Sequence, residues 1–222
     1  MSATAGRLLL VPNTLDLGSA PVDIQQLLPL GVLQQAAQLT HWLAEDARST
    51  RAFLKRVNAV VPLNQPLQQI DIRELPQPSK GGTATALPGD ALWRELLAPA
   101  LGGQDVGLIS EAGLPAVADP GAAAVAAAHA MSITVLPLAG ASSLMLALAA
   151  SGLNGQSFAF VGYLPQEAAA RLARIKELQL QSRRGNQTQL LIETPYRNAA
   201  MLGALVSALG DETWLSVSCG LS

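Results

Sequence analysis

Short apolar runs alternate along this chain with longer stretches that have the 3.6-residue periodicity of helices. The run Arg7–Val11 is closed by Pro12, as expected for a buried strand. The predicted strands are Arg7–Val11, His41–Ala44, Asp105–Ser110, Ile133–Pro137, Phe158–Val161, Gln189–Glu193 and Trp214–Cys219. The predicted helices are Ser49–Val57, Ala91–Leu101, Ala122–Met131, Ser142–Ser151, Gln166–Gln181 and Asn198–Leu209. Alternation of this kind favours an α/β fold with a mostly parallel sheet.

Local signals predict where two of these helices begin. Ser49 is expected to cap the first helix. Asp119 is expected to cap the helix over Ala122–Met131, with Pro120 in its first turn. Residues 76–90 are rich in proline, glycine and threonine, which predicts a surface loop.

The composition is that of a folded protein with a substantial core. Half of the 222 residues are hydrophobic and 14% are charged, the opposite of a disordered sequence. The single cysteine, Cys219, excludes an intramolecular disulfide framework and a cysteine-rich zinc site. The most apolar stretch, Leu144–Ala150, is far shorter than the ~20 residues of a membrane-spanning helix. The first apolar run is also too short for a signal peptide, and we expect a soluble cytoplasmic protein.

Several common catalytic motifs do not occur in the sequence. It has no G-x-G-x-x-G after a strand, no phosphate-binding G-x-x-x-x-G-K-[ST] and no G-x-S-x-G elbow. The two histidines, His41 and His129, are not part of an H-E-x-x-H pair, and no metal site is predicted. These observations argue against the usual dinucleotide, nucleotide-hydrolase, zinc-hydrolase and serine-hydrolase chemistries.

Loops rich in glycine and proline follow three of the predicted strands. Ligands of open α/β sheets bind at the carboxyl ends of strands, and glycine lets a ligand approach the backbone. The loops are Pro12–Thr14, Ser110–Pro115 with Ala118–Gly121, and Pro137–Ser143. They are either a site that binds through main-chain groups or ordinary connections between strands and helices.

The same loops carry a family resemblance. LISEAGLPAVADPG, ITVLPLAGASSLMLALAASGL and FAFVGYLP resemble the tetrapyrrole methylase superfamily, the class III S-adenosylmethionine-dependent methyltransferases. The resemblance is strongest to its branch of ribosomal RNA small subunit methyltransferases I. The matching residues are Ser110, Glu111, Ala112, Gly113, Pro115, Asp119, Pro120 and Gly121, then Ala44, Glu45, Asp46, Arg48 and Thr50, and finally Glu193, Thr194 and Arg197.

The resemblance implies a two-domain, usually homodimeric enzyme that binds S-adenosylmethionine and methylates a ribose 2′-hydroxyl of small-subunit ribosomal RNA. The expected domains are residues 1–138, with a mostly parallel sheet, and residues 139–222, with a shortened mixed sheet that lacks its last strands. Ribosomal RNA or the small ribosomal subunit is the expected partner, and no membrane association is expected.

The family motifs also suggest which residues act. A 2′-hydroxyl is a poor nucleophile, so its proton must be removed while it is aligned with the methyl group. The catalytic candidates are Glu45, Asp46, Arg48 and Glu111. The cofactor-binding candidates are Pro12, Ser110, Ala112, Gly113, Pro115, Gly140, Ala141, Ser142, Glu193, Thr194 and Tyr196. The acids around Arg48 could instead be ordinary helix-start charges.

Two departures from the family pattern leave alternatives open. The first loop, Val11–Leu15, lacks the usual glycine, and Leu138–Ala141 replaces a Pro-Gly-Pro type of turn. One alternative is a methyltransferase acting on a tetrapyrrole or another small acceptor. The other is a cofactor-binding module that has lost catalysis.

Basic residues are concentrated in two segments. Arg48, Arg51 and Lys55, with Arg56 beside them, have the spacing of one helix face. In the second segment Arg171 and Arg174 share a helix face, and Arg183 and Arg184 are expected in the loop beyond it. Aromatic residues make up only 4% of the chain, so RNA binding would depend on phosphate contacts. Alternatively, both segments are simply solvated helix faces.

Overall fold

The computed structural model describes residues 5–15, 22–76 and 91–221. The predicted loop over residues 76–90 lies outside the described residues apart from Pro76. The chain divides into two compact units, unit 1 over Met1–Ser142 and unit 2 over Ser143–Leu221. No helix of the described residues is both long enough and apolar enough to cross a membrane.

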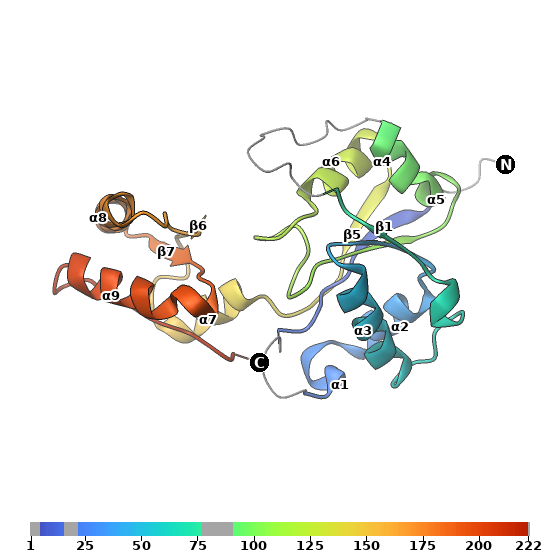
Figure 1. The fold of residues 1–222 in the computed structure, drawn as a ribbon, viewed down its shortest axis with the longest axis horizontal. Helices are drawn as coiled ribbons and strands as arrows, with labels where there is room; N and C mark the ends of the chain where they lie inside the picture. Colours follow the sequence, from blue (N-terminus) through green and yellow to red (C-terminus); the bar gives the residue numbers. More distant parts are fainter. Residues whose placement is uncertain (1–4, 16–21, 77–90, 222) are drawn as a thin grey trace. The chain divides into compact units, whose positions relative to one another are not determined.

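Unit 1 is built on a five-stranded sheet in which every pairing is parallel. Figure 1 labels two of its strands and the helices of the unit. Its strands are β1 (Arg7–Leu10), β2 (His41–Ala44), β3 (Asp71–Glu74), β4 (Val106–Ile109) and β5 (Thr134–Pro137). Their order is β3-β2-β4-β1-β5. The central strand β4 is entirely buried, which explains its continuous apolar sequence.

Helices cover both faces of this sheet. One face packs against α1 (Ile24–Leu27), α2 (Leu30–Gln38) and α3 (Ala47–Asn58). The other packs against α4 (Ala91–Leu96), α5 (Ala98–Leu101) and α6 (Ala122–Ala130). Successive strand residues point to opposite faces, so Leu8 belongs to the second core and Leu9 to the first. The result is a three-layer α/β unit, as the alternating pattern predicts.

A close contact between β2 and β4 explains a glycine in the buried sheet. Trp42 is 1% exposed and packs edge-on against Phe53 of α3, with ring centroids 6.2 Å apart. A Cβ added at Gly107 would lie 2.7 Å from the Trp42 ring. Gly107 therefore provides the space that lets this large side chain lie across the sheet.

Unit 2 contains the parallel pair β6 (Phe158–Gly162) and β7 (Thr188–Leu191). Its helices are α7 (Ser143–Ser151), α8 (Ala168–Gly185) and α9 (Asn198–Ala208), and the short 3-10 helix η2 spans Pro195–Arg197. A separate core joins Leu164, Ile175, Leu178, Met201 and Leu205. The two strands described here are parallel, so the antiparallel pairing of a mixed sheet is not seen among them.

Several predicted details are wrong. Asp46 caps α3 and accepts a hydrogen bond from the N–H of Ser49 at 2.6 Å, so Ser49 is the donor rather than the cap. Helix α6 has Gly121 at its N-cap, with no side-chain cap, because the positive φ of Gly121 (135°) turns the chain before the helix begins. Asp119 is therefore not a capping residue.

Other differences concern the extent of elements. The predicted helix Ala91–Leu101 is two helices separated at Leu97, with Pro99 in the first turn of the second. Helix α8 continues to Gly185, which places Arg183 and Arg184 in its last turn, where cations suit the helix dipole. The predicted strand Trp214–Cys219 has no regular secondary structure, and among the described residues no strand pairs with it.

Candidate functional site

In the strand order of unit 1 the loops of neighbouring strands diverge at the carboxyl ends of the central strands, and we call the region between these loops the crevice. The chain leaves β1 and β2 toward the helices of one face, but leaves β4 toward α6 on the other face. In open α/β sheets, ligands bind where the loops of neighbouring parallel strands diverge in this way. The loops concerned are those after Leu10, Ala44 and Ile109.

A buried asparagine joins two of these loops. Asn13 is 6% exposed, and its amide Nδ2 donates to the carbonyl oxygens of Ser110 at 3.0 Å and Glu111 at 2.9 Å. Its backbone N–H donates to the Gly113 carbonyl at 2.8 Å, and its Oδ1 accepts from the Thr14 N–H. The side-chain amide and the backbone N–H of Asn13 thus hold the loop after β1 against the loop after β4, while its Oδ1 bonds within its own loop.

Glycine brings the loop after β5 to the same place. A Cβ at Gly140 would lie 2.3 Å from the Cβ of Pro12, so only glycine permits this approach. Gly113 has a φ of 64°, and a Cβ there would meet Leu15 at 3.2 Å and the Ala141 carbonyl oxygen at 3.7 Å. The loops after β1, β4 and β5 therefore form one connected surface.

Two glutamates, Glu45 directly after β2 and Glu111 shortly after β4, lie close together beside this surface. The backbone N–H of Glu111 donates to Oε2 of Glu45 at 3.1 Å, and the N–H of Glu45 donates to the Ile109 carbonyl at 3.1 Å. Burial raises the pKa of Glu111, and the negative charges of Glu45 and Asp46 raise it further. Hydrogen bonds from the N–H of Ser49 lower the pKa of Asp46, so Asp46 remains ionised.

A further carboxylate, Asp119, belongs to the same group. Burial, followed by the charges of Glu45 and Glu111, raises its pKa to about 6. Asp119 lies in a segment with unusual backbone conformations, because Ala116 and Ala118 have φ values of 66° and 64°. Non-glycine residues adopt such angles only where the surrounding structure imposes them, and they are concentrated at functional sites.

Most of the predicted site residues lie in unit 1, around this crevice. Ser110 is 2% exposed, and its hydroxyl donates to the Pro120 carbonyl at 3.5 Å, which makes Ser110 a structural support of the loop. Arg48 is exposed on the first turn of α3. The unit 1 candidates are Pro12, Glu45, Asp46, Arg48, Ser110, Glu111, Ala112, Gly113, Pro115, Gly140, Ala141 and Ser142.

The remaining candidates, Glu193, Thr194 and Tyr196, lie in unit 2. Oε2 of Glu193 forms an ion pair with Arg197 at 3.0 Å, and Oε1 accepts from the backbone N–H of Thr194 at 2.8 Å. Arg197 also donates to the Leu164 carbonyl at 3.2 Å. Glu193 thus holds Arg197, and Arg197 in turn connects the segment after β7 to the core residue Leu164. The Tyr196 side chain is 85% exposed.

Two residues of the crevice are absent from the predicted site. The sequence places Asn13 in a loop after a strand, but it does not show that the Asn13 amide bonds to the loop after β4. Asp119 was interpreted as a helix cap, since an acid followed by proline is typical of a helix start. The density of glycine and proline around Asp119 was the signal that could have indicated a special backbone.

Together these features define unit 1 as an α/β protein unit with an acidic, loop-built crevice at the carboxyl edge of a parallel sheet. The chain is similar to proteins named ribosomal RNA small subunit methyltransferase I. It is 43% identical over 118 residues to that of Mesorhizobium japonicum, covering 53% of this chain and 39% of the relative. It is 30% identical over 205 residues to that of Xylella fastidiosa, covering 90% of this chain and 65% of the relative. It is 29% identical over 208 residues to that of Streptococcus pyogenes, covering 94% of this chain and 62% of the relative.

These similarities confirm the resemblance to the ribosomal RNA small subunit methyltransferase I branch of the tetrapyrrole methylase family. No family model matches the chain. The chain spans between about two fifths and two thirds of the length of the three relatives described.

Proposed function

We propose that this chain is an S-adenosylmethionine-dependent methyltransferase and that its acceptor is ribosomal RNA. The observation that carries the proposal is the crevice of unit 1, where Asn13 and Gly140 hold three loops around the carboxylates of Glu45, Glu111 and Asp119. Proteins named ribosomal RNA small subunit methyltransferase I are similar to this chain over 90% and 94% of its length.

The residues of the crevice suit this cofactor. S-adenosylmethionine supplies a methyl group on a positively charged sulfonium, and it also carries an ammonium group. Three carboxylates gathered in one crevice favour a cation, because unpaired negative charges in a partly buried place are relieved by an opposite charge. The glycine-containing loops after β4 and β5 would offer main-chain groups to the neutral parts of the cofactor.

Some of the acidic residues remain ionised, whereas Asp119 can bind and release a proton near neutral pH. Asp46 is held ionised by the α3 cap, and Glu45 is engaged with the backbone of Glu111. Asp119, with a pKa of about 6, is mostly ionised at neutral pH and can still bind a proton. A base with a pKa close to the working pH is best suited to remove the proton of a hydroxyl acceptor. We assign that role to Asp119, with Glu111 as the neighbouring acid that tunes it.

The finer proposal is that the acceptor is a ribose 2′-hydroxyl of small-subunit RNA and that the enzyme acts as a homodimer. The exposed basic face of α3, formed by Arg48, Arg51 and Lys55, would contact RNA phosphates. Arg56 does not belong to this face, because its guanidinium donates to Thr14 and to the Val22 carbonyl.

A methyl-transfer assay with tritiated S-adenosylmethionine tests the proposal. We expect label to appear in RNA of small ribosomal subunits from a strain that lacks the corresponding methylation, at a position resistant to alkaline cleavage if a 2′-hydroxyl is modified. Label in a tetrapyrrole acceptor and not in RNA would favour a small-acceptor enzyme. Cofactor binding without transfer to any acceptor would identify a silent module.

A further inference from the structure

Unit 1 contains a cavity of about 370 Å³ at the carboxyl end of α3. It is lined by Lys55 and Asn58 of α3 and by the segment Leu63–Leu67, which leads into the short 3-10 helix η1 (Leu67–Gln69). Its volume lies within the ~300–1,000 Å³ that is usual for small-molecule sites. We call it the amide cavity, because three of its lining residues carry side-chain amides: Asn58, Asn64 and Gln65.

Much of the hydrogen-bonding capacity of these amides is unused. Oδ1 of Asn58 accepts from the Leu63 N–H at 3.1 Å, which leaves the two N–H donors of Asn58 available. Nε2 of Gln65 donates to the Gln69 carbonyl, which leaves the side-chain oxygen of Gln65 available. The Asn64 side chain bonds to none of the described residues, although its backbone N–H is fixed on the Ala37 carbonyl at 2.8 Å. The cavity therefore offers both donors and acceptors to a ligand.

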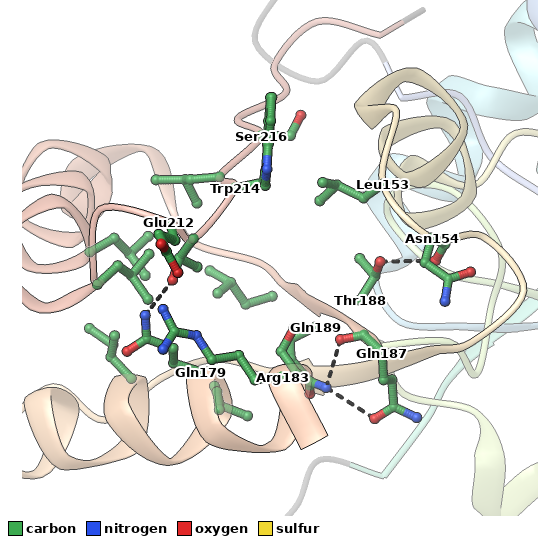
Figure 2. Close-up of a pocket in the computed structure, with 18 of the residues that line it drawn as sticks. Leu153, Asn154, Gln179, Arg183, Gln187, Thr188, Gln189, Glu212, Trp214 and Ser216 are labelled. Atoms are coloured by element: carbon green, nitrogen blue, oxygen red, sulfur yellow. Dashed lines mark hydrogen bonds between the residues drawn. The ribbon is translucent and has the colours of Figure 1, made fainter. Parts of the chain in front are cut away.

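The amides that line a cavity of unit 2 are in a different situation. That cavity, of about 330 Å³, includes Gln179, Gln187 and Gln189 among its lining residues. Figure 2 shows the bond between two of them, in which Nε2 of Gln189 donates to Oε1 of Gln187 at 3.0 Å. Gln179 donates to the Thr213 hydroxyl. A polar ligand there would have to replace bonds that the chain already makes, whereas in the amide cavity it would not.

Apolar side chains complete the amide cavity. Leu63 and Leu67 are half-buried and pack against the core of unit 1, and Pro66 is exposed beside them. None of the described residues that line the cavity is acidic. A matching ligand has an apolar face and an edge of hydrogen-bond donors and acceptors. A nucleobase has both, since side-chain amides pair with the edge of adenine and apolar side chains hold the face of an unstacked base.

A stripe of cations leads along α3 to the amide cavity. Arg48, Arg51, Lys55 and Asn58 recur at i, i+3, i+7 and i+10, so these four exposed residues lie along one side of the helix. Lys55 belongs to both the stripe and the cavity. Neither Arg51 nor Lys55 forms an ion pair with a described residue. Their charges are thus available to the phosphates of a nucleic acid.

We propose that the amide cavity binds an unpaired nucleobase of an RNA strand whose phosphates lie along Arg48, Arg51 and Lys55. This inference rests on the proposed function, because it takes RNA as the acceptor. Helix α3 begins directly after Glu45 and Asp46, and its 12 residues span about 18 Å. A stacked strand advances about 3.4 Å per nucleotide, so a base within about five nucleotides of the methylated one can reach the cavity. The stripe would bind any RNA, and the cavity would add selectivity for a base.

Measurements of RNA affinity separate the base contact from the phosphate contacts. The probes are a fluorescent oligoadenylate of nine nucleotides and an abasic strand of the same length and charge, and anisotropy gives a Kd for each without cofactor. We expect the unchanged chain to bind oligoadenylate at least fivefold more tightly. Asn64→Ala should lose this preference and keep its salt dependence, because an amide contacts the base rather than a phosphate. Arg51→Glu should weaken the binding of both probes alike.

The matched control is Gln68→Ala, which removes an exposed amide of η1 that lies outside the cavity. It should behave as the unchanged chain does, and circular dichroism checks that each variant is folded. An undiminished preference in Asn64→Ala, or equal affinity of the unchanged chain for the two probes, would overturn the amide cavity and leave the methyltransferase proposal standing. Absence of binding to either probe would overturn the cavity and also count against RNA as the acceptor. Cofactor binding is measured separately and does not depend on these results.

Photo-cross-linking locates the bound base. Oligoadenylate that carries 8-azidoadenosine is irradiated with the chain, and the product is digested with trypsin. Trypsin cuts after Arg56 and Arg73, so residues 57–73 form one peptide that contains every lining residue of the cavity except Lys55. We expect the label on this peptide, reduced at least fivefold by Asn64→Ala and unchanged by Gln68→Ala. Label confined to other peptides would mean that the base binds elsewhere and would overturn the proposal.

Discussion

The carboxylate of Glu45 accepts a hydrogen bond from the backbone N–H of Glu111 at 3.1 Å. This contact connects the carboxyl ends of the neighbouring strands β2 and β4. It also holds one negative charge beside the residue whose pKa that charge raises. The hydrogen bond that joins the two strand ends therefore also brings the negative charges of Glu45 and Glu111 close together.

The first prediction concerns the coupling of these carboxylates. Glu45→Gln keeps an oxygen that can accept the Glu111 N–H but removes the charge. We expect the pKa of Glu111 and of Asp119 to fall, because Glu45 raises both. Carboxyl-carbon NMR titration measures the two values. Asp105→Asn, which removes a carboxylate paired with Arg7, is the matched control and should leave both unchanged. Unaltered pKa values in Glu45→Gln would show that the carboxylates do not interact.

The second prediction is a pH dependence of stability. The folded pKa of Asp119, about 6, lies above its ordinary value of 3.8, so the folded state binds the proton more tightly. The free energy of unfolding should fall as pH rises from about 4 to about 6, and the loss should be complete above that range. Asp119→Asn cannot ionise and should be more stable than the unchanged chain at pH 7.5 by about 1 kcal/mol, allowing for partial exposure. Urea unfolding at pH 4, 6 and 7.5 measures this difference.

Asp105 should behave in the opposite way. The guanidinium of Arg7 lowers its pKa, so the stability that it contributes is present at neutral pH and is lost as pH falls through its folded pKa. Asp105→Asn should therefore destabilise the protein slightly at pH 7.5. If Asp119→Asn also destabilised it there, the environment assigned to Asp119 would be wrong.

The third prediction concerns Asn13. Asn13→Ala leaves the carbonyls of Ser110 and Glu111 without their side-chain donor in a buried place. We expect a loss of about 2–3 kcal/mol in the free energy of unfolding, together with weaker cofactor binding. Asn58→Ala removes an exposed acceptor for the Leu63 N–H and should cost less than about 1 kcal/mol. Similar losses in the two variants would contradict a joining role for Asn13.

The fourth prediction is a compensating pair. Gly140→Ala places a Cβ within 2.3 Å of Pro12 and should cost about 2 kcal/mol, because the two loops must separate. Combining it with Pro12→Gly removes the ring and should restore part of that loss, which a double-mutant cycle in urea measures. Gly155→Ala, which would meet nothing within 4 Å, is the control. Additive effects of the two changes would show that the loops are not in contact.

The sequence predicted the strands of unit 1 that are apolar and missed the one that is not. Strand β3 reads Asp-Ile-Arg-Glu and lies at the sheet edge, where partial exposure permits charges. The loops around the candidate site were predicted, because glycine and proline at strand ends are visible in a sequence; that these loops form a binding site stays a prediction. The partners of Asn13 and the Glu45 charge that acts on Asp119 were not predictable, since both depend on loops far apart in the sequence being brought together.

The last predicted strand shows that an alternating sequence pattern is not sufficient to predict a strand. Leu215–Cys219 has the alternation of a strand, but a strand needs a neighbour, and within the described residues none pairs with it. Local pattern reports which face of a segment could be buried; it does not report whether a partner edge is present.

The fifth prediction concerns RNA. Arg51 lies on the exposed face of α3, whereas Arg174 is paired with Glu177 at 2.6 Å on α8. Arg51→Glu should therefore weaken binding of small-subunit RNA more than Arg174→Glu does, and should flatten its salt dependence. Filter binding across a salt series measures both effects. An unchanged salt slope in Arg51→Glu would mean that this face is only solvated.

Calorimetry with S-adenosylhomocysteine, the demethylated cofactor, tests the central claim most directly. The crevice of unit 1 predicts binding of one molecule per chain, weakened at least tenfold by Gly140→Ala and unchanged by Gly155→Ala. Circular dichroism on the same samples establishes that each is folded. Absence of binding by the folded, unchanged chain at millimolar ligand would contradict the assignment of the crevice as a methyl-donor site.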